Sequence, residues 1–193
     1  MKTEKKEVEF TLVEDMLGTI PRNKELYREW IATKNPDPID VTAEELETVI
    51  DGEKGLTGFH TIPEDGIYIM DYFVKGYFKS TGNTYKEILG IKNLSSKLTN
   101  FIFIYPRLIR ISAHSDGTIE RPLRAMTPQG PRVALAQSEF VRAGTSFRCK
   151  IGLYPHKEIT WKKIEAIMDF GEEGIGFGQW RNAGYGRFTW KWV

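Results

Sequence analysis

The sequence has 193 residues and a formal net charge of +1; 40% of the residues are hydrophobic, 12% aromatic and 27% charged, which is typical of a soluble globular domain with a full hydrophobic core. No apolar run approaches the roughly 20 residues needed to span a bilayer, and the charged start "MKTEKKEVEF" lacks the apolar region of a secretion signal. The single cysteine, Cys149, excludes an intramolecular disulfide framework and a cysteine-rich zinc site, so we expect one cytoplasmic domain over residues 1–193.

The first quarter of the chain predicts one strand followed by two helices. Val8, Phe10 and Leu12 alternate with polar residues, as in a half-buried strand. The stretch "KELYREWIATK" has the apolar spacing of a helix, and "TAEELETVI" predicts a second helix with Thr42 as N-cap and Glu45 completing a capping box. The two prolines of "NPDPID" predict a loop between these helices.

The middle of the chain predicts two short strands, two helices and a long apolar strand. "PEDG" is a turn between the short strands, and a helix is expected to begin near Asp71 and to stop at Gly82. "LSSKLTN" predicts a short helix capped by Ser95. "FIFIYPRLIRIS" is strongly apolar, but Pro106 makes it an edge strand, a bulged strand or two separate strands.

The last third of the chain predicts a β-hairpin, a strand, a helix and a final strand. The turn "TPQGP" separates the two strands of the hairpin, and Cys149 is expected to pack as a small hydrophobe in the next strand. "ITWKKIEAIMDFG" is an amphipathic helix that Gly171 closes, and "RFTWKWV" is a strand. This order predicts an α+β fold, and the simplest matching core is the ferredoxin-like (RRM-like) βαββαβ unit with an inserted hairpin and extra helices.

The stretch "GFGQWRNAGYGRF" (Gly176–Phe188, hereafter the glycine segment) combines glycines, arginines and aromatic rings. Free backbone N–H groups in such a stretch can hold an anion, and Arg181 and Arg187 suit phosphates. Its rings, at Phe177, Trp180, Tyr185 and Phe188, would each contribute about 1–3 kcal/mol by stacking on a base. The segment precedes a strand rather than a helix, which excludes a Rossmann turn and a P-loop. It predicts a site for single-stranded RNA or a nucleotide, or else a tight structural connection with Trp180 and Phe188 in the core.

Cationic residues also gather between Tyr105 and Arg132. Residues 1–54 carry eight Lys/Arg and fourteen Asp/Glu, a net charge of −6, whereas residues 55–193 carry nineteen and twelve, a net charge of +7. Arg121 and Arg124 are three residues apart, so on a regular strand they face opposite ways. The region predicts phosphate contacts with salt-sensitive binding, or plain surface charge around a hairpin.

A glycine-rich loop between a last helix and a last strand resembles the signature of the RAMP superfamily, the ferredoxin-like RNA-binding and RNA-cleaving proteins of CRISPR systems. The matching residues are Gly174, Gly176, Gly178, Arg181, Gly184, Gly186 and Arg187. A second patch, "DYFVKGYFK", resembles the "KG" turn of some backbone-type members. That resemblance implies that Lys75 and Gly76 lie near RNA.

Three further stretches, "FTLVEDMLGTIP", "ERPLRAMTPQGPRVALAQSE" and the glycine segment, together look like an uncharacterised family from bacteriophages and prophages. That resemblance covers nearly the whole chain and implies a virus-encoded intracellular protein from an early or nucleic-acid-metabolism gene set.

The histidines, His60, His114 and His156, are scattered and have no metal-ligand spacing. RNA-cleaving RAMP enzymes often use a histidine as general acid or base, but their histidine occupies several positions, so none is assigned here. We predict no catalytic residue, no metal and no cofactor.

The expected function is non-catalytic binding of RNA or another nucleotide ligand, with a protein partner in a host or phage complex possible and no membrane contact. The expected binding residues are Lys75, Arg121, Arg124, Gly176, Gly178, Trp180, Arg181, Asn182, Gly184, Gly186 and Arg187. Three alternatives stay open: a metal-independent RAMP-type endoribonuclease, a host-defence-interacting protein (anti-CRISPR or signal-sequestering), and a structural or assembly protein whose Trp180, Trp190 and Trp192 mark a contact.

Overall fold

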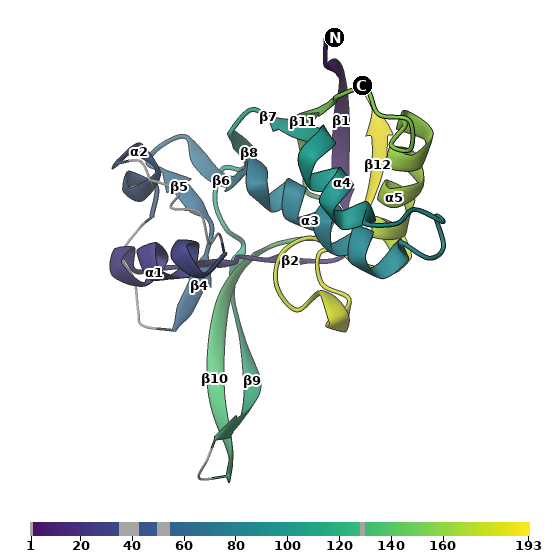
Figure 1. The fold of residues 1–193 in the computed structure, drawn as a ribbon. Helices are drawn as coiled ribbons and strands as arrows, with labels where there is room; N and C mark the ends of the chain where they lie inside the picture. The colour runs from purple at the N-terminus through teal and green to yellow at the C-terminus, as the bar shows by residue number, and fades with distance from the viewer. Residues whose placement is uncertain (1, 35–42, 50–54, 128–129) are drawn as a thin grey trace.

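The structure is a computed structural model that describes residues 2–34, 43–49, 55–127 and 130–193 (Figure 1). Thr42 and the "NPDPID" stretch, for which a helix cap and a loop are expected, lie outside the described residues. None of the described helices is long and apolar enough to cross a membrane.

A four-stranded antiparallel sheet forms the centre of the fold. Its strands in spatial order are β12 (Phe188–Trp192), β1 (Glu4–Leu12), β11 (Ser146–Leu153) and β7 (Ile102–Tyr105). Helix α3 (Asp71–Tyr85) lies in sequence between β1 and β7, and α5 (Trp161–Glu173) lies between β11 and β12. This βαββαβ order with the spatial order fourth, first, third, second is the ferredoxin-like unit, which confirms the predicted α+β class and core.

The main hydrophobic core fills the layer between this sheet and its helices. Phe10 is fully buried and pairs across the sheet with Phe147 on one side and Trp190 on the other. Trp190 and Trp192 hold β12 to α5, because their indole N–H groups donate to Asp169 and Glu165 at 2.9 Å each. These two tryptophans therefore make internal contacts, and the protein contact that a structural role would need stays a prediction.

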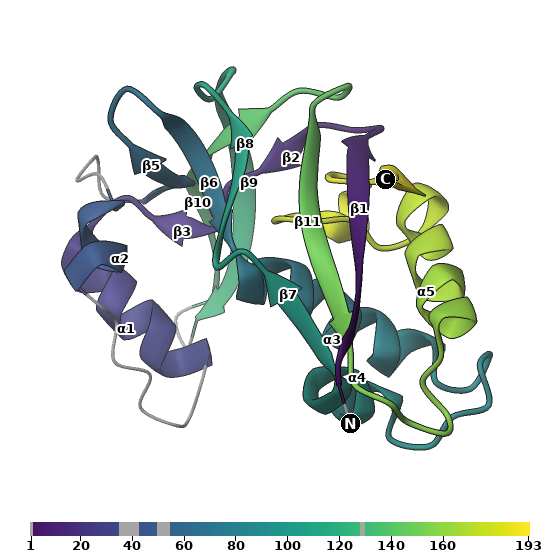
Figure 2. The same cartoon turned by 90° about the horizontal axis from the view of Figure 1, so that it is seen from above.

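A large insertion, residues 13–70, separates β1 from α3. It holds β2 (Met16–Leu17), β3 (Ile20–Pro21), α1 (Lys24–Lys34), α2 (Ala43–Glu47), β4 (Leu56–Gly58), β5 (His60–Ile62) and β6 (Gly66–Met70). Ile20, Tyr27, Ile31 and Val49 form a small core of its own, on which Tyr72 of α3 also packs. Viewed from above, α1 and α2 lie on the side of the molecule opposite to α5 (Figure 2).

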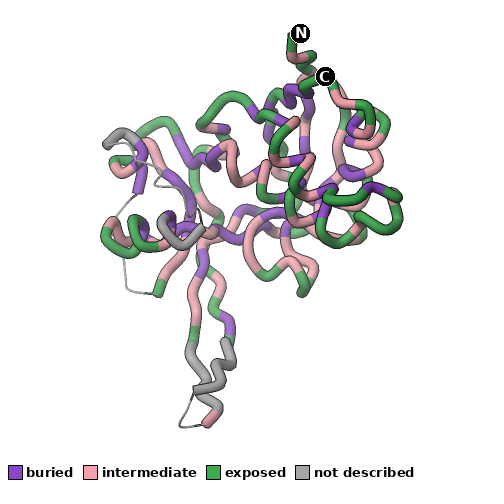
Figure 3. The backbone as a smooth tube through the Cα atoms, in the orientation of Figure 1, coloured by how far each residue is buried: buried purple, intermediate pink, exposed green. Residues whose placement is uncertain are grey.

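A long β-hairpin, hereafter the arm, projects from the body of the molecule (Figure 1). It consists of β9 (Gly117–Thr127) and β10 (Gly130–Val141), as the turn at "TPQGP" predicts. Its root belongs to a second sheet, in which β10 pairs antiparallel with β2 and parallel with β4. The Arg22 and Glu139 side chains, 7% and 14% exposed, form an ion pair of 2.5 Å at this root. Among the arm residues whose burial is described, most are intermediate or exposed (Figure 3).

The remaining elements are helix α4 (Leu94–Phe101) and strand β8 (Leu108–Ser112), which completes a third sheet in the order β5-β6-β8. Pro106 thus separates β7 from β8, which is the third of the outcomes that the sequence left open. The predicted cap of α4 is wrong: the N-cap is Asn93, in left-handed conformation, rather than Ser95.

Two predicted helix ends are also wrong, because both glycines serve close packing inside a helix. α3 continues past Gly82 to Tyr85, and a Cβ on Gly82 would lie 2.8 Å from the Ser95 Cα of α4. α5 continues past Gly171 to Glu173, and a Cβ on Gly171 would overlap the ring of Phe188. In each case tertiary contact, rather than helix termination, explains why the residue is glycine.

Candidate functional site

A cavity of about 640 Å³ lies between α3, the glycine segment and the insertion. This volume is in the range of small-molecule and cofactor sites. Tyr72, Gly76 and Lys79 line it at the helical spacing i, i+4, i+7, so one face of α3 forms a wall. The backbone and side chains of residues 176–179 and Arg181 form the facing wall. The structure thus brings together the two patches, "KG" and glycine segment, that the sequence singled out separately.

The glycine segment is held in place by backbone hydrogen bonds. The Phe177 N–H donates to the Gly186 carbonyl at 2.8 Å, and the Gly186 N–H donates to the Asp15 carbonyl at 2.8 Å. Gly186 has a φ of +72°, and a Cβ there would overlap the Phe177 carbonyl oxygen. A Cβ on Gly178, with φ of +80°, would lie 2.5 Å from the Leu17 carbonyl oxygen. These glycines are required by the close approach of backbone to backbone, as the structural alternative predicts.

Two of the four rings of the segment belong to the core. Phe177 and Phe188 are 1% and 0% exposed and stack on each other with centroids 4.3 Å apart. The expectation that they offer faces to bases is therefore wrong, since no free face remains. Trp180 is 37% exposed, and its ring stacks on that of Tyr185 at 5.8 Å. The prediction of a core position for Trp180 does not hold.

Three cations line the cavity. Lys75 and Lys79 come from α3, and Arg181 comes from the short 3₁₀ helix of residues Arg181–Ala183. Burial lowers the pKa of both Lys75 and Arg181. None of the ion pairs between described residues involves any of the three. The Lys75 Nζ lies 5.3 Å from the centroid of the Phe103 ring. Lys75 and Arg181 therefore supply partly desolvated positive charge to the cavity, and the exposed Lys79 adds a further positive charge.

Arg121 lies behind the cavity wall and is 5% exposed. Its guanidinium donates to the Ser138 hydroxyl at 2.8 Å and to the side-chain carbonyl of Gln179, which lines the cavity. It also lies 5.2 Å from the centroid of the Trp180 ring. Burial lowers its pKa. Arg121 thus ties the root of the arm to the glycine segment through its two terminal nitrogens, while its Nε is buried without a hydrogen-bond partner among the described residues.

The other expected binding residues lie outside the cavity wall. Asn182 is exposed on the 3₁₀ helix, and Gly184 ends that helix with a φ of +91°. Arg187 is bonded to Glu14 at 2.8 Å. The side chain of Arg124 lies outside the described part of the arm. Of the eleven expected residues, four line the cavity: Lys75, Gly176, Gly178 and Arg181.

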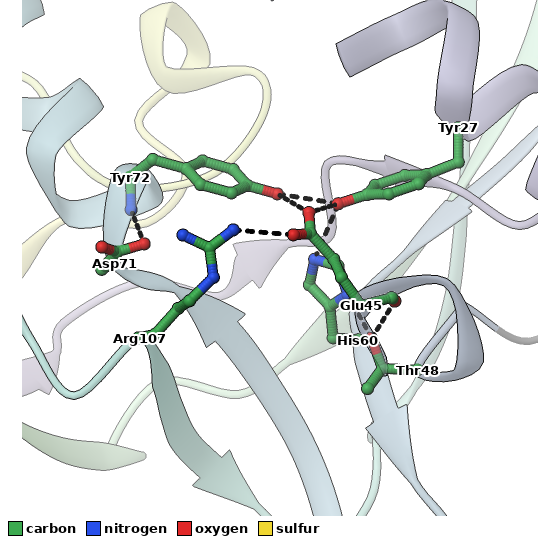
Figure 4. A network of polar contacts seen from close by, with 7 residues as sticks. All are labelled: Tyr27, Glu45, Thr48, His60, Asp71, Tyr72 and Arg107. Atoms are coloured by element: carbon green, nitrogen blue, oxygen red, sulfur yellow. Dashed lines mark hydrogen bonds and ion pairs between the residues drawn. The ribbon is translucent and has the colours of Figure 1, made fainter. Parts of the chain in front are cut away.

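A network of polar side chains adjoins the cavity, and the sequence did not indicate it (Figure 4). It is centred on Glu45, whose side chain is 3% exposed. The Tyr27 hydroxyl donates to Glu45, and the guanidinium of Arg107 donates to it at 2.8 Å. The Tyr27 and Tyr72 hydroxyl groups lie 2.9 Å apart. Glu45 and Tyr72 also line the cavity, so this network forms part of its wall.

Burial governs the protonation of the network. It raises the pKa of Tyr27 and Tyr72, so both hydroxyl groups keep their protons. It lowers the pKa of His60 to about 4, so this imidazole is neutral near pH 7. Desolvation also raises the pKa of Asp71, whose carboxylate accepts from the Tyr72 N–H at 2.9 Å. Glu45, which the sequence predicts as the capping-box residue at the start of a helix, is instead buried at the centre of this network.

None of the three histidines and the cysteine, all within the described residues, lines the cavity. His60 is buried behind Tyr27, and the Nδ1 of His156 accepts from the backbone N–H of Glu158 at 3.1 Å. Cys149 is buried in β11, as predicted, and burial raises the pKa of its thiol to about 12. Within the described ranges, no group of three or more His, Cys, Asp or Glu residues could hold a metal ion.

The open face of the central sheet carries paired charges. Glu9 of β1 binds Lys191 at 2.7 Å and Arg148 at 2.6 Å, and these hydrogen bonds lower its pKa. Beside it, the Thr11 and Ser146 hydroxyl groups lie 2.8 Å apart. The positive charge on this face is therefore largely balanced, in contrast to that of the cavity.

No protein-family model matches the chain, and no curated protein matches it. The resemblance to a phage family therefore stays a prediction.

Among solved structures, the chain is similar to a chain in the cryo-EM structure of the Type III-B Cmr-β complex bound to cognate target RNA. The identity is 12%, the TM-score is 0.48, and the match covers 100% of this chain and 61% of the other, so this chain spans about three fifths of its length. It is also similar to a chain of a Type IV-B CRISPR complex, with 10% identity, a TM-score of 0.49, and coverage of 98% and 90%. We base the functional proposal on the cavity rather than on these likenesses.

Proposed function

We propose that the chain binds single-stranded RNA, or another phosphate-rich nucleotide ligand, in the cavity between α3 and the glycine segment, without chemical reaction. One observation carries the proposal: Lys75, Lys79 and Arg181 converge on one cavity, and none of them forms an ion pair with a described carboxylate. A ligand with two or more phosphates would supply the missing negative charge.

The partial burial of these cations strengthens the case for an anionic ligand. Burial disfavours the charged form of Lys75 and Arg181, as the lowered pKa of each shows. A phosphate would reverse that cost, because a hydrogen bond to a charged group contributes about 1.5–3 kcal/mol. Cations kept partly desolvated without an ion pair are unfavourable for stability alone, which supports a binding role.

Aromatic rings on the same cavity suit the bases of such a ligand. Trp30 of α1 and Phe73 of α3 line it, and both are partly exposed. Stacking on such rings is tolerant of sequence because every base has a flat face. The open face of the sheet, where an RRM would bind RNA, is less suitable because Arg148 and Lys191 there are both bonded to Glu9.

Blocking the cavity is the sharpest test, and Gly76 allows it. A Cβ on this exposed helical glycine meets nothing within 4 Å, so substitution does not disturb the fold. Gly76→Glu places a carboxylate beside Lys75 and Lys79, and we expect loss of binding to a fluorescently labelled single-stranded RNA by more than about tenfold. Gly76→Ala is the matched control and is expected to bind as the wild type does.

Removal of a positive charge gives a second test, measured by the fluorescence anisotropy of the same labelled RNA. Arg181→Ala should weaken binding about 10- to 100-fold and reduce the slope of log K against log salt by about 0.7, the value for one phosphate contact on a single strand. Arg148→Ala, on the open face, removes the same charge and should leave both unchanged. Wild-type protein without salt-sensitive binding, or equal losses in the two variants, would contradict the proposal.

The other functions predicted from the sequence stay as alternatives. A metal-independent endoribonuclease would cut labelled RNA in EDTA and lose that activity in one of the variants His60→Ala, His114→Ala or His156→Ala. A protein that sequesters a nucleotide signal would retain a small nucleotide through purification, detectable by absorbance at 260 nm and mass spectrometry. A host or phage protein partner would co-purify from infected cells.

A further inference from the structure

The direction of each hydrogen bond in the Glu45 network follows from counting protons. Tyr27 has one hydroxyl proton, and it donates that proton to Glu45. In the 2.9 Å contact between the two tyrosines, Tyr27 must therefore be the acceptor and Tyr72 the donor. Tyr72 also lies 3.4 Å from the same carboxylate oxygen. Its single proton is thus used inside the network.

The donors and acceptors around Thr48 and His60 can be assigned in the same way. The Thr48 hydroxyl donates its proton to the Glu45 carbonyl at 2.7 Å. His60 Nδ1, which lies 2.7 Å from the Thr48 oxygen, must therefore carry the proton of that contact. His60 Nε2 is then an acceptor, 3.5 Å from the Tyr27 hydroxyl. This assignment of the tautomer rests on the hydrogen-bond pattern.

The cavity consequently has two chemically distinct ends. Tyr72 and Glu45 line one end, and their side-chain oxygens have no proton left to donate, so these oxygens can only accept hydrogen bonds. Lys75 and Lys79 follow Tyr72 along α3 by about 4.5 and 10.5 Å, at the helical rise of about 1.5 Å per residue. A ligand must therefore offer a hydrogen-bond donor close to its anionic group.

We propose that the Glu45–Tyr72 end accepts a hydrogen bond from a ribose 2′-hydroxyl, so that the site selects ribonucleotides over 2′-deoxyribonucleotides. This inference rests on the proposed function. Tyr72 and Lys75 are three residues apart and so lie about 4.5 Å apart along the axis of α3. This proximity along the helix favours the sugar of the nucleotide whose phosphate Lys75 binds, because the donors on a base edge lie farther from the phosphate. The 2′-hydroxyl is the group by which proteins tell RNA from DNA.

The test compares four labelled oligonucleotides of one sequence: RNA, 2′-deoxy, 2′-fluoro and 2′-O-methyl. The fluoro and methyl analogues lack the hydroxyl donor. We expect the wild type to bind RNA about tenfold more tightly than the other three, the typical effect of leaving a polar group unpaired. Tyr72→Phe should lower the affinity for RNA to the 2′-deoxy level and leave the affinity for 2′-deoxy unchanged. Tyr185→Phe, outside the cavity wall, is the matched control and should keep the preference.

Three results would overturn the inference in distinguishable ways. Equal binding of RNA and 2′-deoxy that still depends on Arg181 refutes sugar selection and leaves the proposed function standing. A preference that follows base identity instead of the sugar assigns the acceptor end to a base amine. Absence of binding to all four oligonucleotides removes the proposed function together with the inference.

Discussion

Two neighbouring glycines, Gly184 and Gly186, allow conformational strain and backbone packing to be separated. Both have positive φ, +91° and +72°, so alanine is strained at either position. They differ in their surroundings. A Cβ on Gly184 has its nearest neighbour 3.8 Å away in the Arg187 side chain, whereas a Cβ on Gly186 would overlap the Phe177 carbonyl oxygen.

The expected cost of Gly184→Ala is small. The left-handed conformation costs an L-residue about 1–2 kcal/mol, and the reduced freedom of the unfolded chain offsets about 0.4–1 kcal/mol of it. The net loss in unfolding free energy should be about 1 kcal/mol. For a protein of this length, that corresponds to a fall in Tm of about 2–4 °C.

The expected cost of Gly186→Ala is several times larger. Relief of the overlap requires the Phe177 backbone to move, which overpacks the segment at about 1–3 kcal/mol. It also breaks the 2.8 Å hydrogen bond from Phe177 to Gly186, a further loss of about 1 kcal/mol. With the strain, the total is about 3–5 kcal/mol. Urea unfolding followed by circular dichroism measures both variants, and equal losses would refute the packing explanation.

Two further predictions concern buried charge. Burial lowers the pKa of His60 from 6.5 to about 4, so as the pH falls the imidazole is protonated in the unfolded chain before it is protonated in the folded one. The unfolding free energy should therefore decrease by about 3 kcal/mol between pH 6.5 and 4 and stay constant above pH 6.5. His60→Gln should lose this dependence and the exposed His114→Gln should retain it, as urea unfolding at several pH values would show. Arg22→Met strands the Glu139 carboxylate and should cost about 3–5 kcal/mol, while Arg22→Met with Glu139→Leu restores most of it. A double variant as unstable as the single one would contradict this account.

Local patterns were sufficient to predict the ferredoxin-like core. The alternation of Val8, Phe10 and Leu12 and the apolar spacing of α5 each reflect burial against one neighbouring layer. The break at Pro106 and the hairpin turn also depend on residues close in sequence. Within the glycine segment, Phe177 lies in the core, as the structural alternative predicts, and Arg181 lines the cavity, where RNA binding remains a proposal.

Hydrogen bonds between residues distant in the sequence could not be predicted from the sequence. Glu45 has the helical position of a solvated capping residue, and only the folded chain shows that Tyr27, Tyr72 and Arg107 surround it. Arg121 was expected at a phosphate, but it bonds to Gln179, 58 residues later. A single sequence indicates which residues can bond, whereas their partners depend on how the insertion folds against α3.

The strand order of the central sheet has a consequence for how the chain folds. Among the strands that the structure describes, β1 pairs with β11 and β12, and its Val8 lies opposite Cys149 and Trp192. During synthesis, most of the chain must be made before either of the strands that pair with β1 exists. Contacts so distant in sequence make folding slow. The earlier segments, and the insertion above all, have time to collapse on the wrong partner, so we expect release from the ribosome and access to chaperones to limit the yield of native protein.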